Sequence, residues 1–404
     1  MSGGSGRRNC AARGLSGRNS GDRLRSGVRG NIAAVGNRRR NSNAESEVFG
    51  ALDLGTNNCR LLVARPAQDG FQVVDSFSRV VRLGEGLSYS DYLSDSAIER
   101  TLKALKICAG KMRHMGVTQA RCVATEACRR ASNYSDFQKK VAFEFGLELE
   151  LISSFQETQL AVYGCEPLFD PAVETALVFD IGGGSTEVSW VALSRNPRER
   201  GGAKADSSYQ PAGFNGALED PRNASWDALQ ANEGIAGARS EPLAWKSLPM
   251  GVTSLAERFG GGDLSVDCYE RMVAAVLEEL QPFETENLIS GPIRDGRVQM
   301  LGTSGTVTTL VGIEKNLPRY DRRRVDGAYL SRDSIESLNR RVAAMSYQER
   351  VAHPCIGPER ADLVVAGCAI LDALCRTWPV ERLRVADRGL REGIIFTLMR
   401  GIVA

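Results

Sequence analysis

Apolar positions along the chain are interrupted by a glycine-rich turn in a pattern that occurs twice. Residues 51–58 read Ala-Leu-Asp-Leu-Gly-Thr-Asn-Asn, and residues 179–187 read Phe-Asp-Ile-Gly-Gly-Gly-Ser-Thr-Glu. Each is an apolar strand with one aspartate that ends in a turn of glycine and polar residues. A second apolar strand follows, at 60–64 and at 188–193. One such turn is typical of an ordinary hairpin, whereas the repetition indicates a duplicated unit.

The spacing of apolar residues also predicts the remaining elements. Further strands are expected at 71–77, 121–125, 147–153, 244–248, 299–302 and 383–385. Helices are expected at 95–116, from 126, and at 157–163, 253–259, 269–281, 331–344, 358–374 and 391–399. Ser331 is expected to cap one helix and Pro358 to open another. Hairpins that alternate with helices, in a pattern restarted halfway, predict a duplicated α/β fold with a cleft between the halves.

Two segments lack the apolar positions that a core needs. Residues 1–47 consist mainly of Gly, Ser, Asn and Arg and are predicted to be a disordered basic leader. This leader is either an arm that binds RNA or another polyanion, or an inert segment. Residues 195–242 are rich in Gly, Ala, Ser, Asn and Pro and are predicted to be a surface insertion with little structure.

Bulk composition limits the classes of protein that need considering. The 404 residues are 42 % hydrophobic, which is enough for two or three domains, and no run of about 18 apolar residues predicts a membrane span. The ten cysteines include no C-x-x-C pair, so we expect reduced thiols in a cytoplasmic protein and no zinc site. Only His114 and His353 occur, which argues against mechanisms built on histidine clusters.

The net charge of +2 conceals an asymmetry. Residues 1–47 hold ten arginines against Asp22, Glu45 and Glu47, which leaves the rest of the chain acidic by about five charges. Because an acidic body attracts a long polyanion poorly, arginines in the cleft, such as Arg60, would have to bind it locally.

The two repeated turns carry the candidate chemistry. Asp53 and Asp180 each lie between large apolar residues, where a carboxylate is costly unless a cation meets it. Backbone N–H groups in a glycine turn form a concavity that binds anions. We therefore predict that the two loops face one Mg²⁺-bound phosphate.

Eight short segments, in order between about residues 48 and 399, resemble motifs of the exopolyphosphatase/guanosine pentaphosphate phosphohydrolase (Ppx/GppA) phosphatase family. They are Asp53-Leu-Gly-Thr-Asn-Asn-Cys-Arg-Leu-Leu62, Arg82-Leu-Gly-Glu-Gly86, Ala124-Thr-Glu-Ala-Cys-Arg129, Ile152-Ser-Ser-Phe-Gln-Glu157, Asp180-Ile-Gly-Gly-Gly-Ser-Thr-Glu187, Ser247-Leu-Pro-Met-Gly251, Gly302-Thr-Ser-Gly-Thr306 and Asp387-Arg-Gly-Leu-Arg-Glu-Gly393. No single motif is specific, but the ordered set is. The resemblance implies a duplicated RNase H-like fold of the actin-like ATPase and sugar-kinase superfamily, with two domains around an interdomain cleft.

The resemblance also implies where the domains and the site lie. The first RNase H-like domain is expected at 48–168 and the second at 169–390. Packing of the C-terminal helix, at about 391–404, against the first domain is left open. Glu157 matches the catalytic general base, and Asp53 and Asp180 match Mg²⁺-holding residues. The implied phosphate-binding residues are Thr56, Asn57, Arg129, Gly182, Gly183, Gly184, Ser185 and Thr186.

Several positions keep two interpretations. Arg82 either contacts phosphate or is an ordinary surface arginine. Glu157 alone would be typical of a carboxylate that complements a helix dipole, and Glu187 is either a support of the site or a cross-strand partner. The Gly302–Thr306 turn either lies at a nucleoside site or is only a tight turn. The chain departs from the family at Gln156 and Gln159, where acid and arginine are commoner, which alters the charge around Glu157.

The function implied is Mg²⁺-dependent release of terminal orthophosphate from inorganic polyphosphate. Hydrolysis of guanosine pentaphosphate to the tetraphosphate is the alternative, and a superfamily kinase or ATPase and an inactive polyphosphate or nucleotide sensor are further ones. The expected partner is therefore one of these two polyphosphorylated substrates, with neither a membrane nor nucleic acid involved. A homodimer is left open.

Overall fold

The computed structural model describes residues 47–68, 70–193 and 240–401. Met1–Ser42 and Asn43–Ala404 are separate units, and every described residue belongs to the second. The predicted leader therefore lies outside the described residues except at position 47, and so does most of the predicted insertion 195–242. The predicted end of this insertion is wrong, because residues 240–242 already belong to a strand that pairs with its neighbour.

The first sheet has five strands in the order β3-β2-β1-β4-β5. Its strands are β1 (Phe49–Leu54), β2 (Asn58–Ala67), β3 (Gly70–Val80), β4 (Gln119–Ala124) and β5 (Leu149–Leu151). Strands β1, β2 and β3 form an antiparallel meander, whereas β4 and β5 run parallel to β1. The meander brings Asp53 of β1 opposite Arg60 of β2.

The second sheet has six strands in the order β10-β11-β9-β6-β7-β8. Its strands are β6 (Thr175–Ile181), β7 (Thr186–Leu193), β8 (Ser240–Leu248), β9 (Val298–Thr303), β10 (Tyr329–Ser331) and β11 (Arg382–Ala386). An antiparallel meander, β6-β7-β8, is again extended by parallel strands, β9 and β11, and β10 is added antiparallel at the edge. The shared order confirms the predicted duplicated RNase H-like α/β fold.

The helices alternate with these strands. They are α2 (Leu87–Ser90), α3 (Asp95–His114), α4 (Glu126–Arg130), α5 (Tyr134–Phe145), α6 (Ser154–Cys165), the 3₁₀ turn η1 (Glu166–Leu168), α8 (Val252–Phe259), α9 (Val266–Asn287), α10 (Ser290–Arg294), α11 (Gly305–Glu314), α12 (Arg322–Val325), α13 (Arg332–Ala344), α14 (Tyr347–Ala352), α15 (Val364–Thr377) and α16 (Leu390–Met399). Helices α3 and α5 bury their apolar faces with the first sheet, and α9, α13 and α15 do so with the second.

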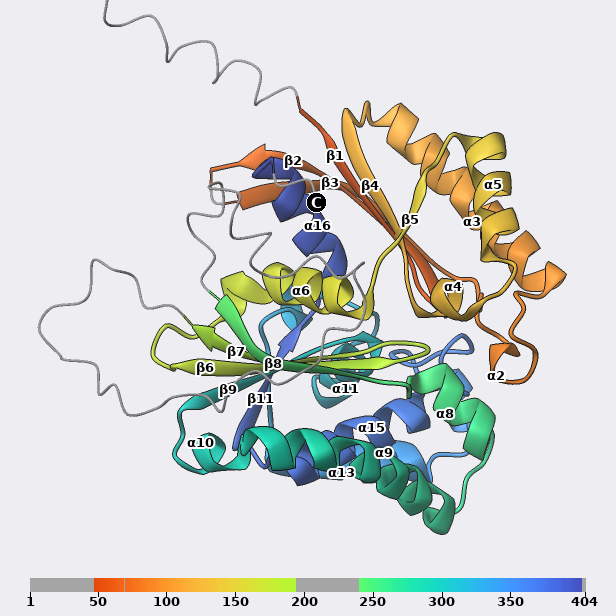
Figure 1. Ribbon diagram of the computed structural model, residues 1–404. Coiled ribbons are helices and arrows are strands. Elements are labelled where there is room, and N and C mark those ends of the chain that lie inside the picture. The colour runs from red at the N-terminus through yellow and green to blue at the C-terminus, as the bar shows by residue number, and fades with distance from the viewer. Residues whose placement is uncertain (1–46, 69, 194–239, 402–404) are drawn as a thin grey trace, which may run out of the picture. The chain divides into compact units, whose positions relative to one another are not determined.

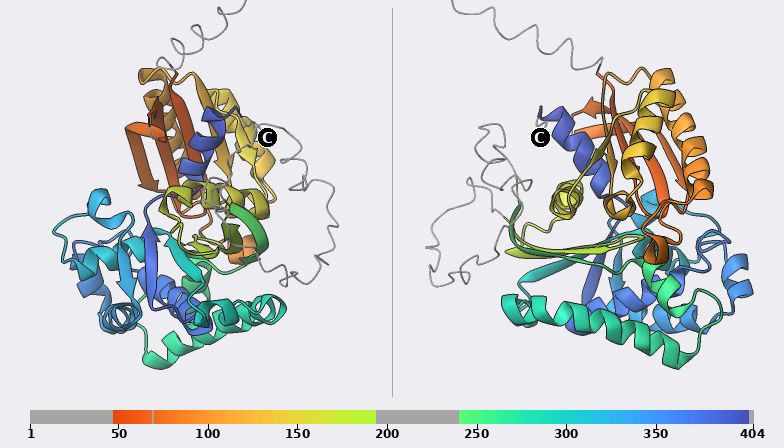
Figure 2. Two further views of the ribbon diagram at one scale, coloured as in Figure 1. Left: turned by 90° about the vertical axis from the view of Figure 1, so that its left-hand side faces the viewer. Right: turned by 45° about the vertical axis from the view of Figure 1, so that its right-hand side comes forward.

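Helices α6 and α16 lie between the two sheets (Figures 1 and 2). Leu390, Ile394 and Ile395 of α16 pack on the first sheet, and Val162 and Cys165 of α6 pack on the second. The two helices also pack against each other. Helix α6, which carries Glu157, is therefore held from both sides.

A serine cap begins α13, as the sequence predicts. The Ser331 hydroxyl accepts the backbone N–H of Ser334, as an N-cap does. The predicted helix start at Pro358 is wrong, because α15 begins only at Val364. The buried Arg350 side chain donates to the Ala361 carbonyl at 2.7 Å. This carbonyl is therefore bonded to a side chain and not to a helical N–H, and the residues before Val364 form turns.

Burial agrees with the apolar pattern on which the elements were predicted. The nine cysteines of the described residues are free thiols, and eight of them are buried. Among these residues, no helix combines the length and the apolar character that crossing a bilayer requires.

Candidate functional site

A cavity of about 460 Å³ is lined by residues of both glycine turns. It brings together nine of the predicted site residues, which are Asp53, Thr56, Asn57, Glu157, Asp180, Gly182, Gly183, Gly184 and Ser185. Three others, Arg82, Arg129 and Thr186, are not part of its lining. Residues from both sheets therefore face one space.

The two turns touch each other directly. A Cβ added to Gly183 would lie 3.0 Å from Thr56 Cβ and 3.1 Å from the Asn57 nitrogen, and one added to Gly184 would lie 2.7 Å from Thr56 Oγ1. Only glycine leaves room for this approach, so the backbone N–H groups of the second turn reach the same space as the first.

Backbone hydrogen bonds hold both turns in place. In the first, Gly55 N–H donates to the Asn58 carbonyl at 2.9 Å, and Gly84 N–H donates to the Thr56 carbonyl at 2.9 Å. In the second, Gly182 N–H donates to the Ser185 carbonyl at 2.9 Å. Each loop is closed on itself before any ligand binds, which is the preorganisation that anion binding needs.

Asp53 and Asp180 occupy matching positions in the two hairpins. Burial raises the pKa of Asp53, and it raises the pKa of Asp180 to about 7, with the Glu157 carboxylate adding to the effect. The positive charges of Arg60 and Arg391 lower both pKa values in opposition. These two positive charges reduce the free-energy cost of burying a carboxylate in an apolar strand.

The donor set suits a hard cation. Asp53 and Asp180 line the cavity together with Asn57, whose buried Oδ1 has no hydrogen-bond partner among the described residues. Those same residues contain no group of three or more His, Cys, Asp or Glu side chains placed to hold a metal. Mg²⁺ commonly takes one or two carboxylates and completes its shell with water and phosphate oxygens, so Asp53 and Asp180 fit this ion.

Glu157 lies in the first turn of α6. The helix begins at Ser154, three residues before its predicted start. Gln156 completes a capping box, since Ser153 N–H donates to Gln156 Oε1 at 3.0 Å and Gln156 N–H donates to Ser153 Oγ at 3.2 Å. The departure from the family at this position therefore caps the helix that presents Glu157.

The Glu157 carboxylate is partly buried, with 15 % of its side chain exposed. Burial raises its pKa to about 8, the Glu187 carboxylate adds to this, and Arg129 opposes it. Arg129 Nη1 lies 2.8 Å from Glu157 Oε2. A carboxyl tuned toward neutral pH is suited to general-base catalysis.

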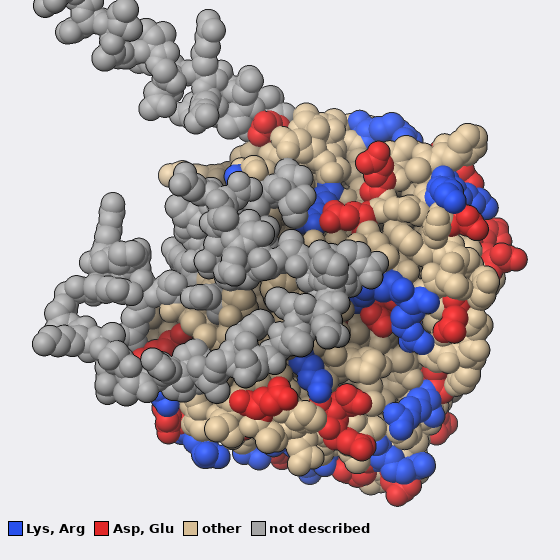
Figure 3. All heavy atoms as spheres, in the orientation of Figure 1, with Lys and Arg blue, Asp and Glu red and all other residues tan. Residues whose placement is uncertain are grey.

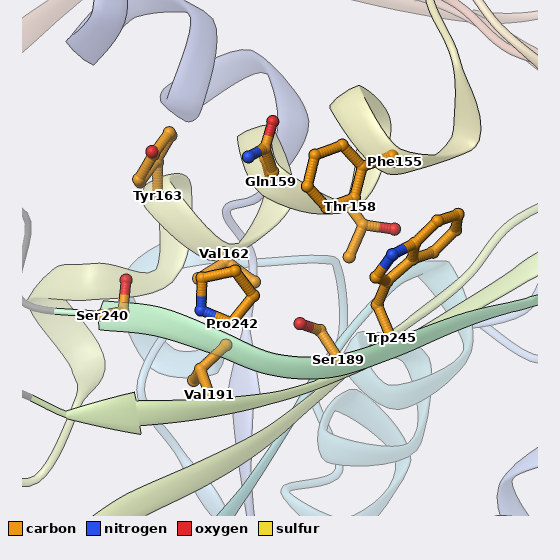
Figure 4. A pocket seen from close by; sticks show the side chains of 10 residues that line it. All are labelled: Phe155, Thr158, Gln159, Val162, Tyr163, Ser189, Val191, Ser240, Pro242 and Trp245. Carbon is orange, nitrogen blue, oxygen red and sulfur yellow. The ribbon is translucent and has the colours of Figure 1, made fainter. Parts of the chain in front are cut away.

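The opposite face of α6 packs on strands β7 and β8, as Figure 4 shows. The Phe155 and Trp245 rings lie 5.3 Å apart between centroids. Gln159 lines a cavity of about 10 Å³ together with Ser189 and is 7 % exposed. Its Nε2 has no hydrogen-bond partner among the described residues, which costs free energy, but an unpaired arginine charge at this position would cost more.

Three predicted residues make other contacts. Thr186 Oγ1 donates to the Met250 carbonyl at 2.7 Å. Arg82 pairs with Asp362 at 2.8 Å. Arg129 bonds to carboxylates rather than lining the cavity. Their predicted phosphate contacts stay predictions.

Glu187 is the cross-strand neighbour of Asp180 in the β6–β7 pair. Its Oε1 accepts hydrogen bonds from Ser185 Oγ at 2.6 Å and from Ser247 Oγ at 3.1 Å. Burial raises its pKa to about 7, and the two serine hydroxyls oppose the rise. Both interpretations of this residue therefore hold, because it pairs across the strands and also orients Ser185.

The Gly302–Thr306 turn is a tight strand–helix turn, and its alternative role at a nucleoside site stays a prediction. Ser304 Oγ caps α11 by accepting Thr306 N–H at 3.1 Å. Ser304, Gly305 and Thr306 also line the cavity. It is a tight strand–helix turn that faces the same space as the phosphate loops.

Among the cavity residues to which the sequence assigned no role are Arg360, Arg391 and Glu126. Within the described residues, neither guanidinium has a carboxylate oxygen within the 4.0 Å of a salt bridge, and Arg360 donates to Thr309 Oγ1 at 3.0 Å. Arg391 lies in the family-like motif at 387–393, so the resemblance could have identified it. Arg360 follows Pro358 in a segment predicted as helix, so nothing in the local pattern indicated it.

Comparison with known proteins agrees with this geometry. The model of the Ppx/GppA phosphatase family matches residues 62–199 and 232–401. An exopolyphosphatase structure from Cytophaga hutchinsonii is 21 % identical, with a TM-score of 0.70 over 88 % of this chain and 99 % of its own. A Ppx/GppA family member from Aquifex aeolicus is 23 % identical, with a TM-score of 0.65 over 89 % of this chain and 99 % of its own. These structures share the fold, and because the family model covers most of the sequence, the chain belongs to the Ppx/GppA phosphatase family.

Proposed function

We propose that the protein is an exopolyphosphatase, which releases terminal orthophosphate from inorganic polyphosphate by attack of water. The observation that carries this proposal is that two glycine turns, two aspartates and one partly buried glutamate line a single cavity. Phosphoryl transfer depends on positioning and charge neutralisation more than on covalent chemistry. Such a cavity supplies both.

The terminal phosphate would be bound by backbone N–H groups of Gly182–Ser185 and by the Thr56 hydroxyl. Asp53 and Asp180 would hold Mg²⁺, directly or through water, and the ion would neutralise charge on the phosphoryl group. Glu157 would accept the proton of the attacking water, for which its carboxylate must be ionised. Its hydrogen bond with Arg129 orients the carboxylate for that step.

The rest of a polyphosphate chain would be bound by the cavity arginines. Arg60, Arg360 and Arg391 line the cavity, and within the described residues no carboxylate lies within salt-bridge distance of them. On the face seen in Figure 3, basic and acidic side chains are interspersed. Mixed charge of this kind provides no strong long-range field for a polyanion, so affinity would come from the cavity.

Guanosine pentaphosphate is the second candidate substrate. Tyr320 lines the cavity and is 46 % exposed, which offers an aromatic face on which a base can stack. Kinase or ATPase activity and a silent sensor are the remaining alternatives, and both are distinguished by the same assay.

The test is phosphate release from long-chain polyphosphate, guanosine pentaphosphate and ATP, side by side at one Mg²⁺ concentration. We expect the highest kcat/KM on polyphosphate. Glu157→Gln is expected to lower kcat by about 10²–10⁴-fold with binding intact, whereas the exposed-surface control Glu144→Gln keeps wild-type rates. Preference for ATP would favour the kinase or ATPase. No release from any substrate, together with binding of polyphosphate or nucleotide measured by calorimetry, would favour the sensor.

A further inference from the structure

We propose that Glu126 is a positioning residue, which holds the Arg129 guanidinium next to Glu157 and away from the substrate. This inference rests on the proposed function, since it assigns a role beside the base of that reaction. Glu126 and Arg129 are three residues apart on α4, at the end of strand β4. Their side chains are 18 % and 16 % exposed.

The hydrogen bonds of Arg129 are almost fully used. Its Nε and Nη2 donate to Glu126 Oε2 at 3.2 and 2.9 Å. Its Nη1 donates to the Ile152 carbonyl at 3.0 Å and to Glu157 Oε2 at 2.8 Å. A guanidinium has five N–H donors, so one is left, whereas a bidentate contact with phosphate needs two.

The position of Glu126 is itself constrained. It lines the cavity, and a Cβ added to Gly184 would lie 2.9 Å from Glu126 Cγ. The stem of Glu126 therefore rests on the second glycine turn while its carboxylate holds Arg129. One side chain thus links the phosphate loop to the arginine that orients the base.

The charges around Glu157 come from several elements. Arg129 and Glu126 extend from α4, Glu187 from β7, Asp53 from β1 and Asp180 from β6. Within the part of the chain that the structure describes, Arg129 is the one cation in contact with Glu157. Without Glu126, this cation would have fewer carboxylates to hold it, and its guanidinium would be free to turn toward the cavity.

A KM-against-kcat comparison tests this role. In the full-length enzyme on polyphosphate, Glu126→Gln is expected to lower kcat about tenfold, because small displacements of a catalytic group are costly, and to leave KM within twofold. Arg129→Ala is expected to lower kcat with KM likewise unchanged. The double variant is expected to match Arg129→Ala, since residues that act through one another are not additive. Glu126→Asp, which keeps the charge, is expected to recover part of kcat.

Binding of tripolyphosphate, measured by calorimetry, separates this inference from the proposed function. Equal dissociation constants for the wild type and Arg129→Ala support a positioning role even if the wild type shows no turnover. A tenfold weaker constant, or a tenfold rise in KM with kcat unchanged, would show that Arg129 binds phosphate and would overturn the inference. Additive losses in the double variant, or a fall in melting temperature with unchanged kcat, would overturn it as well.

Discussion

At the scale of single residues, the ionisation of Glu157 should control the rate. Burial raises its pKa to about 8, so below that pH the carboxyl is mostly protonated and cannot accept a proton from water. We expect kcat/KM for polyphosphate to rise with pH, by about tenfold per unit well below the pKa, and to level off above it. Bound Mg²⁺ would lower this pKa, because a cation favours the ionised carboxylate. Stopped assays at fixed Mg²⁺ between pH 5.5 and 9 would measure this, and a flat profile would argue against Glu157 as the base.

Asp180 is expected to affect metal dependence more than folding. Burial raises its pKa to about 7, so Asp180→Asn removes a costly charge from the fold but also removes an anionic ligand. The Mg²⁺ concentration that gives half-maximal activity should rise at least about tenfold, with the melting temperature of the metal-free protein unchanged or higher. Asp136→Asn, at an exposed position, is the matched control. An unchanged Mg²⁺ titration curve would remove Asp180 from the metal site.

At the scale of elements, close contact between α6 and α16 holds the helix that carries Glu157. A Cβ added to Gly393 would overlap the Leu160 carbonyl oxygen, whereas one added to Gly110 in α3 meets nothing within 4 Å. We expect Gly393→Ala to cost at least about 2 kcal/mol of unfolding free energy and to lower kcat, because the helices must separate. Gly110→Ala should be neutral or stabilising by up to about 1 kcal/mol. Chemical denaturation compares the two, and equal stabilities would show that the contact relaxes.

The antiparallel pairing of β7 with β8 allows the segment between these strands to be shortened. Leu193 pairs with Ser240 at the open ends of the two antiparallel strands, so a short turn suffices to join them. We expect replacement of residues 196–238 by a few Gly and Ser residues to retain a cooperative melt and Glu157-dependent phosphate release. Loss of soluble protein would show that the segment contributes to the body.

At the scale of the whole molecule, the clustered carboxyls should make stability depend on pH. The pKa values of Glu157, Asp180 and Glu187 are raised to about 8, 7 and 7, chiefly by burial. The folded protein therefore holds more protons than the unfolded chain between about pH 5 and 8, and its free energy of unfolding falls as the pH rises through that window.

Denaturation of the metal-free protein at pH 5.5 and pH 8 measures this effect. Glu187→Gln, which removes one of the three groups, should reduce the loss, and saturating Mg²⁺ should oppose it because a bound cation favours the ionised carboxylates. Greater stability at pH 8 than at pH 5.5 would contradict the expectation.

Local pattern in the sequence determined much of this protein. Two hairpins with an aspartate before each turn, their order along the chain and the Ser331 cap follow from contacts between near neighbours, and all appear in the structure. The local pattern of strand and turn located both aspartates, whereas Glu157 came from the resemblance to the family. All three line one cavity, and their roles stay predictions. The duplication followed from the repeated pattern.

Tertiary structure alone decided the partners of the side chains. Arg360 reaches the cavity from a segment whose turns depend on Arg350, which bonds to the Ala361 carbonyl and is not evident from apolar spacing. The donors of Arg129 bond to Glu126 and Glu157, which lie on two different elements, and the sequence indicated neither partner. Such choices follow from which groups meet once the sheets and helices have packed, because hydrogen bonding and desolvation depend on three-dimensional surroundings that no local pattern specifies.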